Sequence, residues 1–294
     1  MEKAKAEETI QDFKSFIASE VKKYKGIYVP VRSGFLRRAL VKNLPCRKLH
    51  PNPDDEFTFP DIGPNDQIIG QYVSKIQKAQ LYGMRIFDEP LTVERIRPDG
   101  YMLLNGHHRW AAAIRMNLKK VPVEIVNLTQ LSDIREMLGK SQNTKRATLD
   151  LDEVVFRPER DELTEKSPVI FLRHLYRENL RLGIPALFRY LNTHGYDVWV
   201  YSSEYHSLDH IRHLFLVYHV NVTGIVTGTG RKGHRRMESK EMDRLIAEKY
   251  PVTLHIDEKA VVRFENNGFE EIPLAAEGAQ WSSGVIETIG KLEK

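Results

Sequence analysis

Short β-rich runs alternate with helical segments through the second half of the chain, and this alternation constrains the fold more than any other feature. The runs read ATLDLD, YDVWVYS, VTGIV and VTLHID. Parallel strands need long crossover connections, usually helices, so the alternation predicts a doubly wound, mainly parallel α/β sheet. We expect this domain over residues 147–275, preceded by a linker over 131–146 and followed by a tail over 276–294.

Polar side chains follow three of these runs. Asp150 and Asp152 end the first run, Ser202 ends the second, and Asp257 with Glu258 ends the last. In open α/β sheets, ligands bind outside the carboxyl ends of the strands. Carboxylates gathered there would repel one another unless a hard divalent cation lay among them, and Mg²⁺ fits oxygen ligands of this kind.

Four stretches in order resemble the motifs of the haloacid dehalogenase (HAD) superfamily, from about Ala147 to Pro273. They are DLDEVV, which matches the DxDx[TV][LV] signature, then VWVYSS, ESKEMDRLIAEKY and LHIDE. The resemblance implies a Rossmann-like fold and a magnesium-dependent phosphohydrolase that forms an aspartyl phosphate. It also implies the residue roles: Asp150 as nucleophile, Asp152 as general acid and then base, Ser202 and Lys240 as phosphoryl contacts, and Asp150, Asp152 (through its carbonyl) and Asp257 as metal ligands.

Two departures from the motifs leave roles open. Glu258 stands where the family usually has a second Asp, and Lys232 competes with Lys240 as the active-site lysine.

The loop GRKGHRR, with Arg231 and Lys232, could bind neighbouring phosphates or could be a solvated basic loop. Three histidines at helical spacing, in HSLDHIRH, favour a surface or packed face over a metal site.

The segment LLNGHHRWAAA in the first half predicts a strand, a tight turn and a helix. Gly106 allows the turn, and the free amides of His107 and His108 at the helix start favour an anion. Arg109 adds a planar guanidinium suited to phosphate. Further zinc ligands are missing nearby, so the residues predict a phosphate-binding turn.

The wider stretch EPLTVERIRPDGYMLLNGHHRWAAAIRMNLKKVPVEIV resembles the ParB/sulfiredoxin superfamily, over about Tyr28 to Leu128. It has a P-[IL]-x-V strand, a G-x-x-R loop and a closing VPV strand, and KLHPNPDDEF matches the upstream segment. The resemblance implies an α+β nucleotide-binding domain over residues 1–130, and some members of the superfamily are free-serine kinases. The resemblance would make Glu56 the general base, with Asp55 as the second candidate. It would also place Gly106, His107, His108 and Arg109 in contact with the phosphates of the nucleotide.

Two branches of this superfamily do not fit. Sulfiredoxins carry a cysteine where this chain has His107, and Cys46 is the only thiol. Chromosome-partitioning ParB proteins have a helix-turn-helix domain after this module, whereas an α/β domain follows here. The remaining branch binds nucleotide.

Charge is uneven between the halves. Residues Met1–Arg146 carry 25 Lys and Arg against 17 Asp and Glu, and Ala147–Lys294 carry 19 against 23. A basic first half favours phosphate-bearing partners. We expect no membrane partner and a cytoplasmic location, because the chain lacks a long apolar stretch, a signal-peptide pattern and paired cysteines.

These observations predict a two-domain phosphate-handling enzyme with Mg²⁺ and a nucleotide (ATP, ADP or CTP) as cofactors and a phosphorylated substrate. Two alternatives stay open. One is a protein that binds nucleic acid or processes its ends, and the other is a nucleotide-binding regulator with an inactive HAD domain.

Overall fold

The computed structural model describes residues 2–157, 163–166, 178–229, 236–265 and 268–293. The chain divides into two compact units, one comprising Met1–Asn127 and the other Leu128–Gly230 and Arg236–Lys294. Each unit has its own buried apolar core. No helix among the described residues is long and apolar enough to span a membrane.

The first unit is built around a mixed sheet with strand order β2-β6-β4-β5-β3, in which β1 pairs with β4. Its elements in chain order are α1 (Glu2–Tyr24), β1 (Val29–Pro30), α2 (Phe35–Leu40), β2 (Asn43–Pro45), β3 (Leu49–His50), α3 (Asp66–Tyr82), β4 (Leu91–Arg97), β5 (Tyr101–Asn105), α4 (His107–Arg115) and β6 (Lys120–Val126). A 3₁₀ turn, Glu56–Thr58, lies in the loop after β3.

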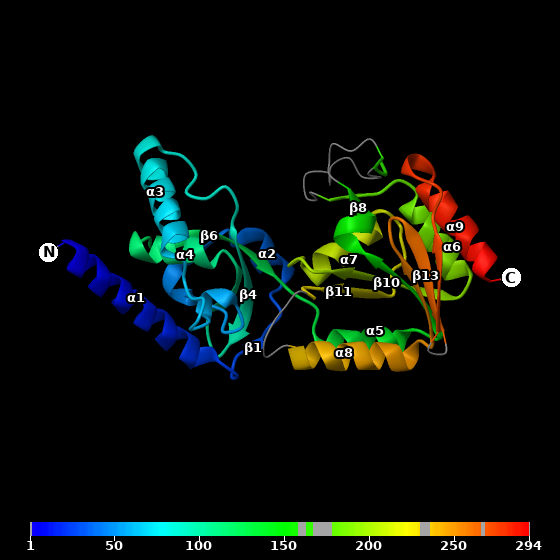
Figure 1. The fold of residues 1–294 in the computed structure, drawn as a ribbon, viewed down its shortest axis with the longest axis horizontal. Coiled ribbons are helices and arrows are strands. Elements are labelled where there is room, and N and C mark those ends of the chain that lie inside the picture. The colour runs from blue at the N-terminus through cyan, green and yellow to red at the C-terminus, as the bar shows by residue number, and fades with distance from the viewer. Residues whose placement is uncertain (1, 158–162, 167–177, 230–235, 266–267, 294) are drawn as a thin grey trace. The chain divides into compact units, whose positions relative to one another are not determined.

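Most residues of helix α4 are buried. Ala111, Ala112 and Ala113 have no exposed surface, and Trp110 is 1% exposed. Small side chains let the helix backbone approach its neighbours closely, and α4 follows directly after β5 in the chain. Figure 1 shows α4 within the first unit.

The second unit contains a sheet with order β11-β10-β7-β12-β13-β14. The elements are α5 (Leu131–Lys140), β7 (Lys145–Asp150), β8 (Phe156–Arg157), β9 (Asn179–Leu180), α6 (Ile184–Thr193), β10 (Tyr196–Ser202), α7 (Leu208–Val217), β11 (Gly224–Thr227), α8 (Arg236–Lys249), β12 (Val252–Ile256), β13 (Ala260–Glu265), β14 (Gly268–Pro273) and α9 (Trp281–Leu292). Strands β11, β10, β7 and β12 are parallel, and β13 and β14 are antiparallel.

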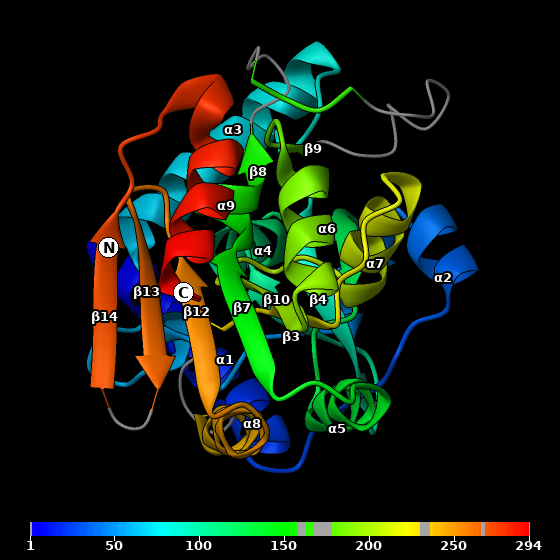
Figure 2. The ribbon, with the colours of Figure 1, turned by 90° about the vertical axis from the view of Figure 1, so that its right-hand side faces the viewer.

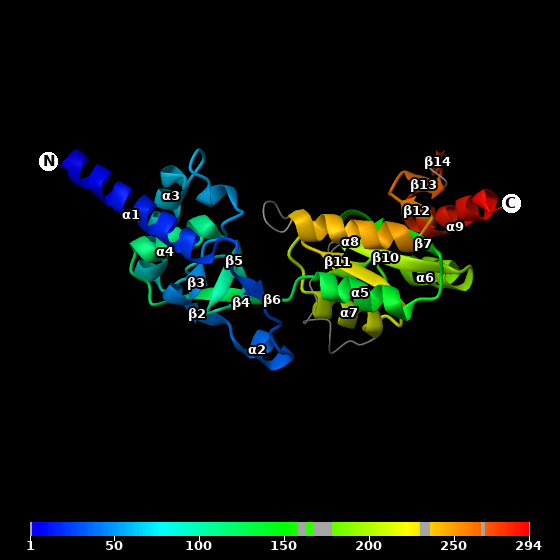
Figure 3. The ribbon, with the colours of Figure 1, turned by 90° about the horizontal axis from the view of Figure 1, so that it is seen from below.

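The sheet is therefore mixed, and the prediction of a mainly parallel sheet holds for the four neighbouring strands β11, β10, β7 and β12. Helices α5 and α8 lie on one face, and α6, α7 and α9 lie on the other (Figures 2 and 3). Strands β13 and β14 lie at one edge of the sheet, and β12 leads through a tight turn into β13.

Two expected boundaries are wrong. Residues 131–140 of the expected linker form α5, which buries Ile134 and Met137 in the core of the second unit. Residues 281–292 of the expected tail form α9, whose Trp281, Val285 and Ile289 belong to the same core. Both helices pack an apolar stripe, which is why they are ordered parts of the unit.

Candidate functional site

The strand register brings polar residues together at the carboxyl edge of the second sheet. Tyr201 pairs with Asp150, so Ser202 is the next residue beyond this level on β10. Leu149 pairs with Ile256, so Asp150 and Asp257 are the next residues on two neighbouring parallel strands. The expected convergence of strand ends thus follows from the register.

Asp150 shapes the turn that follows its own strand. Its Oδ1 accepts hydrogen bonds from the backbone N–H groups of Asp152 at 2.7 Å and Glu153 at 2.8 Å, at the start of a single π-helical turn, Leu151–Val155. The other oxygen, Oδ2, receives no hydrogen bond from the described residues. The carboxylate is therefore oriented through one oxygen while the second stays available.

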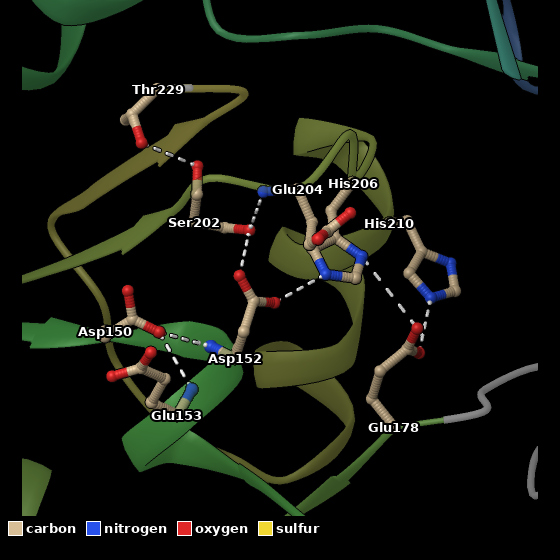
Figure 4. A network of polar contacts seen from close by, with 9 residues as sticks. All are labelled: Asp150, Asp152, Glu153, Glu178, Ser202, Glu204, His206, His210 and Thr229. Carbon is tan, nitrogen blue, oxygen red and sulfur yellow. Dashed lines mark hydrogen bonds and ion pairs between the residues drawn. The ribbon is translucent and has the colours of Figure 1, made fainter. Parts of the chain in front are cut away.

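Asp152 points away from Asp150, into a cluster of polar side chains (Figure 4). Its Oδ2 accepts a hydrogen bond from Ser202 Oγ at 2.6 Å, and its Oδ1 lies 2.8 Å from His206 Nε2. Ser202 Oγ in turn accepts the backbone N–H of Glu204 at 3.0 Å. Both carboxylate oxygens of Asp152 are thus engaged.

The protonation states follow from these contacts. Burial alone would raise the pKa of Asp152, but the hydrogen bonds from His206 and Ser202 lower it overall. Burial alone would lower the pKa of His206, but the carboxylate of Asp152 raises it overall. Each shift favours the charged form of its group, a carboxylate on Asp152 and an imidazolium on His206.

A second carboxylate extends the network. Glu178 Oε1 lies 3.9 Å from His206 Nδ1, and its Oε2 lies 3.4 Å from His210 Nε2. Burial alone would raise the pKa of Glu178, but the hydrogen bond from His210 lowers it overall. His206 and His210 therefore belong to this polar network, a role that the sequence did not predict. His206 lies just before α7 and His210 lies in its first turn, and their spacing of four residues close after Ser202 was the signal, whereas nothing nearby in sequence pointed to Glu178.

Lys240 is exposed on α8, and Arg231 and Lys232 lie outside the described residues. Asp257 Oδ1 accepts the backbone N–H of Glu258 at 2.6 Å.

Glu258, which stands where the HAD motif usually has a second Asp, contacts two arginines. Its Oε1 lies 2.7 Å from Arg157 Nη2 and 3.5 Å from the buried Arg181. Arg181 stacks on the Trp281 ring at 4.0 Å, and Trp281 Nε1 donates to the Glu258 carbonyl at 2.9 Å. These contacts fasten the loop that carries Asp257 to helix α9.

The chemistry of this edge is compatible with a magnesium ion held by few protein ligands. Within the described part of the chain, no three His, Cys, Asp or Glu side chains are grouped so as to hold a metal. Mg²⁺ keeps several waters and commonly binds one or two carboxylates together with substrate phosphate. Asp150 and Asp257, adjacent by register, supply that pair, whereas the side chain of Asp152 is turned away.

The first unit contains a cavity of about 750 Å³ at the N-terminus of α4. Its lining includes Gly106, His107, His108 and Arg109, together with the basic residues Lys75, Lys78 and Arg85. The structure thus brings together all four residues predicted for the phosphate-binding turn.

Each of the two histidines fastens a different loop. The backbone N–H of Asn52 donates to His107 Nε2 at 3.2 Å, and that of Asn65 donates to His108 Nε2 at 3.2 Å. Because a backbone N–H can only donate, both Nε2 atoms are acceptors and neither bears a proton. Burial lowers the pKa of His107 to about 4 and lowers that of His108. Both histidines are neutral, with the ring proton on Nδ1, and each acts as a clasp that holds one loop through its Nε2.

His107 Nδ1 faces a carboxylate. It lies 3.6 Å from Asp55 Oδ2, while Asp55 Oδ1 accepts the backbone N–H of Phe57 at 2.9 Å. Asp55 lines the cavity, whereas Glu56 is exposed and does not. Of the two predicted bases, the geometry therefore favours Asp55.

Gly106 and the side chain of Arg109 lie in close contact. Gly106 has φ +95°, and a Cβ there would lie 3.1 Å from the Arg109 guanidinium and 3.1 Å from Leu91. Arg109 Nη1 donates to the Glu89 carbonyl at 2.6 Å, and the side chain is 8% exposed. The glycine is required both by backbone conformation and by the close approach of the arginine.

Part of the chain is similar to a known protein family. Residues 74–142 match the family described as the ParB N-terminal domain. A structure of C-terminally truncated chromosome-partitioning protein ParB from Caulobacter crescentus with CTP-gamma-S is 24% identical, with a TM-score of 0.24, over 35% of this chain and 55% of that chain. Free serine kinase in complex with AMP is 12% identical, with a TM-score of 0.24, over 78% of this chain and 86% of that chain.

This chain spans about half the length of that ParB protein. No curated protein sequence matches it. The family match therefore supports a ParB-like part of the chain over residues 74–142, and the rest of the second unit is argued from its own geometry.

Proposed function

We propose that the chain is a two-unit phosphate-handling enzyme, with a HAD-type phosphomonoesterase in the second unit and a nucleotide-binding module in the first. One observation carries the phosphatase proposal. Asp150 ends the central parallel strand, with one carboxylate oxygen oriented by two backbone amides and the other available to attack. Asp257 and Ser202 follow the two neighbouring strands.

The first chemical step is attack by Asp150 Oδ2 on phosphorus. A P–O bond forms to the carboxylate, and the P–O bond to the leaving group breaks, with the electron pair departing on the leaving oxygen. Because its pKa is lowered and both its oxygens are hydrogen-bonded, Asp152 is a poor proton donor to that oxygen in this arrangement. Leaving groups that depart as stable anions, such as phenolates, are therefore favoured.

The second step hydrolyses the phosphoaspartate. Asp152 accepts a proton from water as the water oxygen attacks phosphorus, and the bond from phosphorus to Asp150 breaks. His206 and Ser202 keep Asp152 charged and oriented for that role. When bound by Asp150, Asp257 and the carbonyl of Asp152, Mg²⁺ would screen the negative charge between enzyme and phosphate.

The nucleotide proposal rests on the cavity of the first unit. The family match covers its α4 side and the basic residues Lys75, Lys78 and Arg85. A helix N-terminus and fixed guanidinium beside several cations favour a polyphosphate, which we take to be ATP, ADP or CTP. If the module also transfers a phosphoryl group, Asp55 is the base, since its carboxylate lines the cavity beside His107.

The occupied state of Asp152 favours one second candidate. With both oxygens of Asp152 engaged, the sheet edge of the second unit would bind phosphate without turning it over. The protein would then act as a regulator through nucleotide binding in its first unit.

Phosphate release from p-nitrophenyl phosphate with and without Mg²⁺ tests the phosphatase. The Asp150→Asn variant should lose turnover by at least 10³-fold, while the exposed Asp61→Asn variant should keep it. Full activity of folded Asp150→Asn would refute the nucleophile, and no turnover by the parent protein would favour the regulator. Calorimetric titration with ATP, ADP and CTP, compared with Arg109→Met, tests the nucleotide site independently.

A further inference from the structure

Strand β7 carries polar side chains on the face of the second sheet that α8 covers. A central strand is normally apolar on both faces. Arg146, Thr148 and Asp150 alternate on β7 with the buried Ala147 and Leu149. Strands buried on both faces usually read as continuous apolar runs. The polar row therefore needs an explanation other than packing.

A cleft of about 440 Å³ lies along this row. Its walls are the polar row of β7, Tyr201 of β10, His255 of β12, and Asp243 on α8. The volume exceeds what a single water needs and suits a small polar molecule.

Arg146 is held in one orientation within the cleft. Its Nε donates to Thr253 Oγ1 at 2.9 Å, its Nη1 donates to Tyr201 Oη at 2.9 Å, and its guanidinium lies 5.8 Å from the Tyr250 ring. Among the described residues, none accepts a hydrogen bond from Nη2. A fixed guanidinium with a remaining donor is preorganised for a carboxylate.

Asp243 supplies the opposite charge on the other wall. Asp243 lines the same cleft as Arg146, and its side chain is exposed to solvent. Yet no ion pair within 4.0 Å joins them in the part of the chain that the structure describes. Two opposite charges that face one cleft without closing on each other leave room for a molecule bearing both complementary charges.

We propose that this cleft binds a compact zwitterion, with its carboxylate on Arg146 and its ammonium group on Asp243. Each contact is a charge-assisted hydrogen bond of about 2.8 Å. The chemistry is that of an α-amino acid, either free as an effector or as the organic part of a phosphorylated substrate, because the cleft reaches Asp150. Only the second source rests on the proposed phosphatase.

Calorimetric titration of the full chain tests the site without relying on turnover. The probes are glycine, L-alanine and L-serine, with propionate and n-propylamine as single-charge controls. We expect at least one amino acid to bind at least tenfold more tightly than either control. Arg146→Met and Asp243→Asn should each weaken that binding at least tenfold, while Arg244→Met, on the exposed side of α8, should change it less than twofold. Arg146→Lys keeps the charge and covers the case in which Arg146→Met does not fold.

Equal binding of propionate, unchanged binding in both variants, or no binding of any amino acid below 10 mM would overturn the proposal. Asp150→Asn should still bind, so failure of the phosphatase leaves this result readable. O-phosphoserine then separates the two sources. If the zwitterion belongs to the substrate, Asp243→Asn raises KM for O-phosphoserine but not for p-nitrophenyl phosphate. If it is an effector, the free amino acid binds together with p-nitrophenyl phosphate.

Discussion

Acidification should destabilise the first unit through His107, and the size of the effect follows from the structure. Burial lowers the pKa of His107 in the folded state from 6.5 to about 4. Between these two values the unfolded state binds a proton that the folded state does not. The stability is therefore complete above pH 6.5, is lost as pH falls from 6.5 towards 4, and changes no further below 4.

The shift corresponds to about 3 kcal/mol in full and to about 2 kcal/mol between pH 7.5 and pH 5. His107→Gln removes this titration while keeping an acceptor for the Asn52 amide, which donates to the imidazole at 3.2 Å. The variant should therefore lose about 2 kcal/mol less than the parent protein over the same range.

Urea unfolding at the two pH values, followed by pulsed hydrogen exchange of the peptide over 107–115, reports on this unit alone. Replacement of the exposed His219 with Asn, which tolerates the positive φ of 53° there, is the matched control and should behave as the parent. Parallel pH dependence of the parent and His107→Gln would refute the assignment of His107 as a buried neutral clasp.

Three further predictions concern packing and leaving groups. Gly106→Ala should destabilise the first unit by about 1–3 kcal/mol and weaken nucleotide binding, because φ +95° and the nearby arginine both oppose a Cβ; denaturation and calorimetry measure the two effects. Asp197→Ala should destabilise the second unit by about 3 kcal/mol, because the buried carboxylate accepts hydrogen bonds from Tyr250 at 2.7 Å and Asn143 at 3.0 Å; an unchanged urea midpoint would contradict this. Aryl phosphates should be hydrolysed at least tenfold faster than alkyl phosphates, since the lowered pKa of Asp152 makes it a poor proton donor, and equal kcat/KM values would show that a proton donor acts on the leaving group.

The central architecture could be predicted because its signals are local. Strands β7, β10, β11 and β12 are short β-rich runs, and the turn before α4 is marked by Gly106. The strand ends then follow from topology, since parallel strands finish at one edge.

What the sequence did not reveal depends on contacts between distant segments. Glu178 meets His206 and His210 only through the fold. The protonation state of Asp152 likewise depends on the side chain of His206, more than fifty residues away. In contrast, α9 had a visible signal, because Val285, Ile289 and Leu292 recur at helical spacing.

Helix α9 is synthesised after every strand of its sheet, yet it fastens the loop that carries Asp257 through Trp281 and Arg181. A nascent chain that has emerged only as far as β14 has all the polar residues of the edge but lacks this anchor. The carboxyl edge therefore reaches its final form only late in biosynthesis, after the hairpin and α9 have docked. A chain truncated before Trp281 should hold its sheet less firmly at the end where the proposed chemistry takes place.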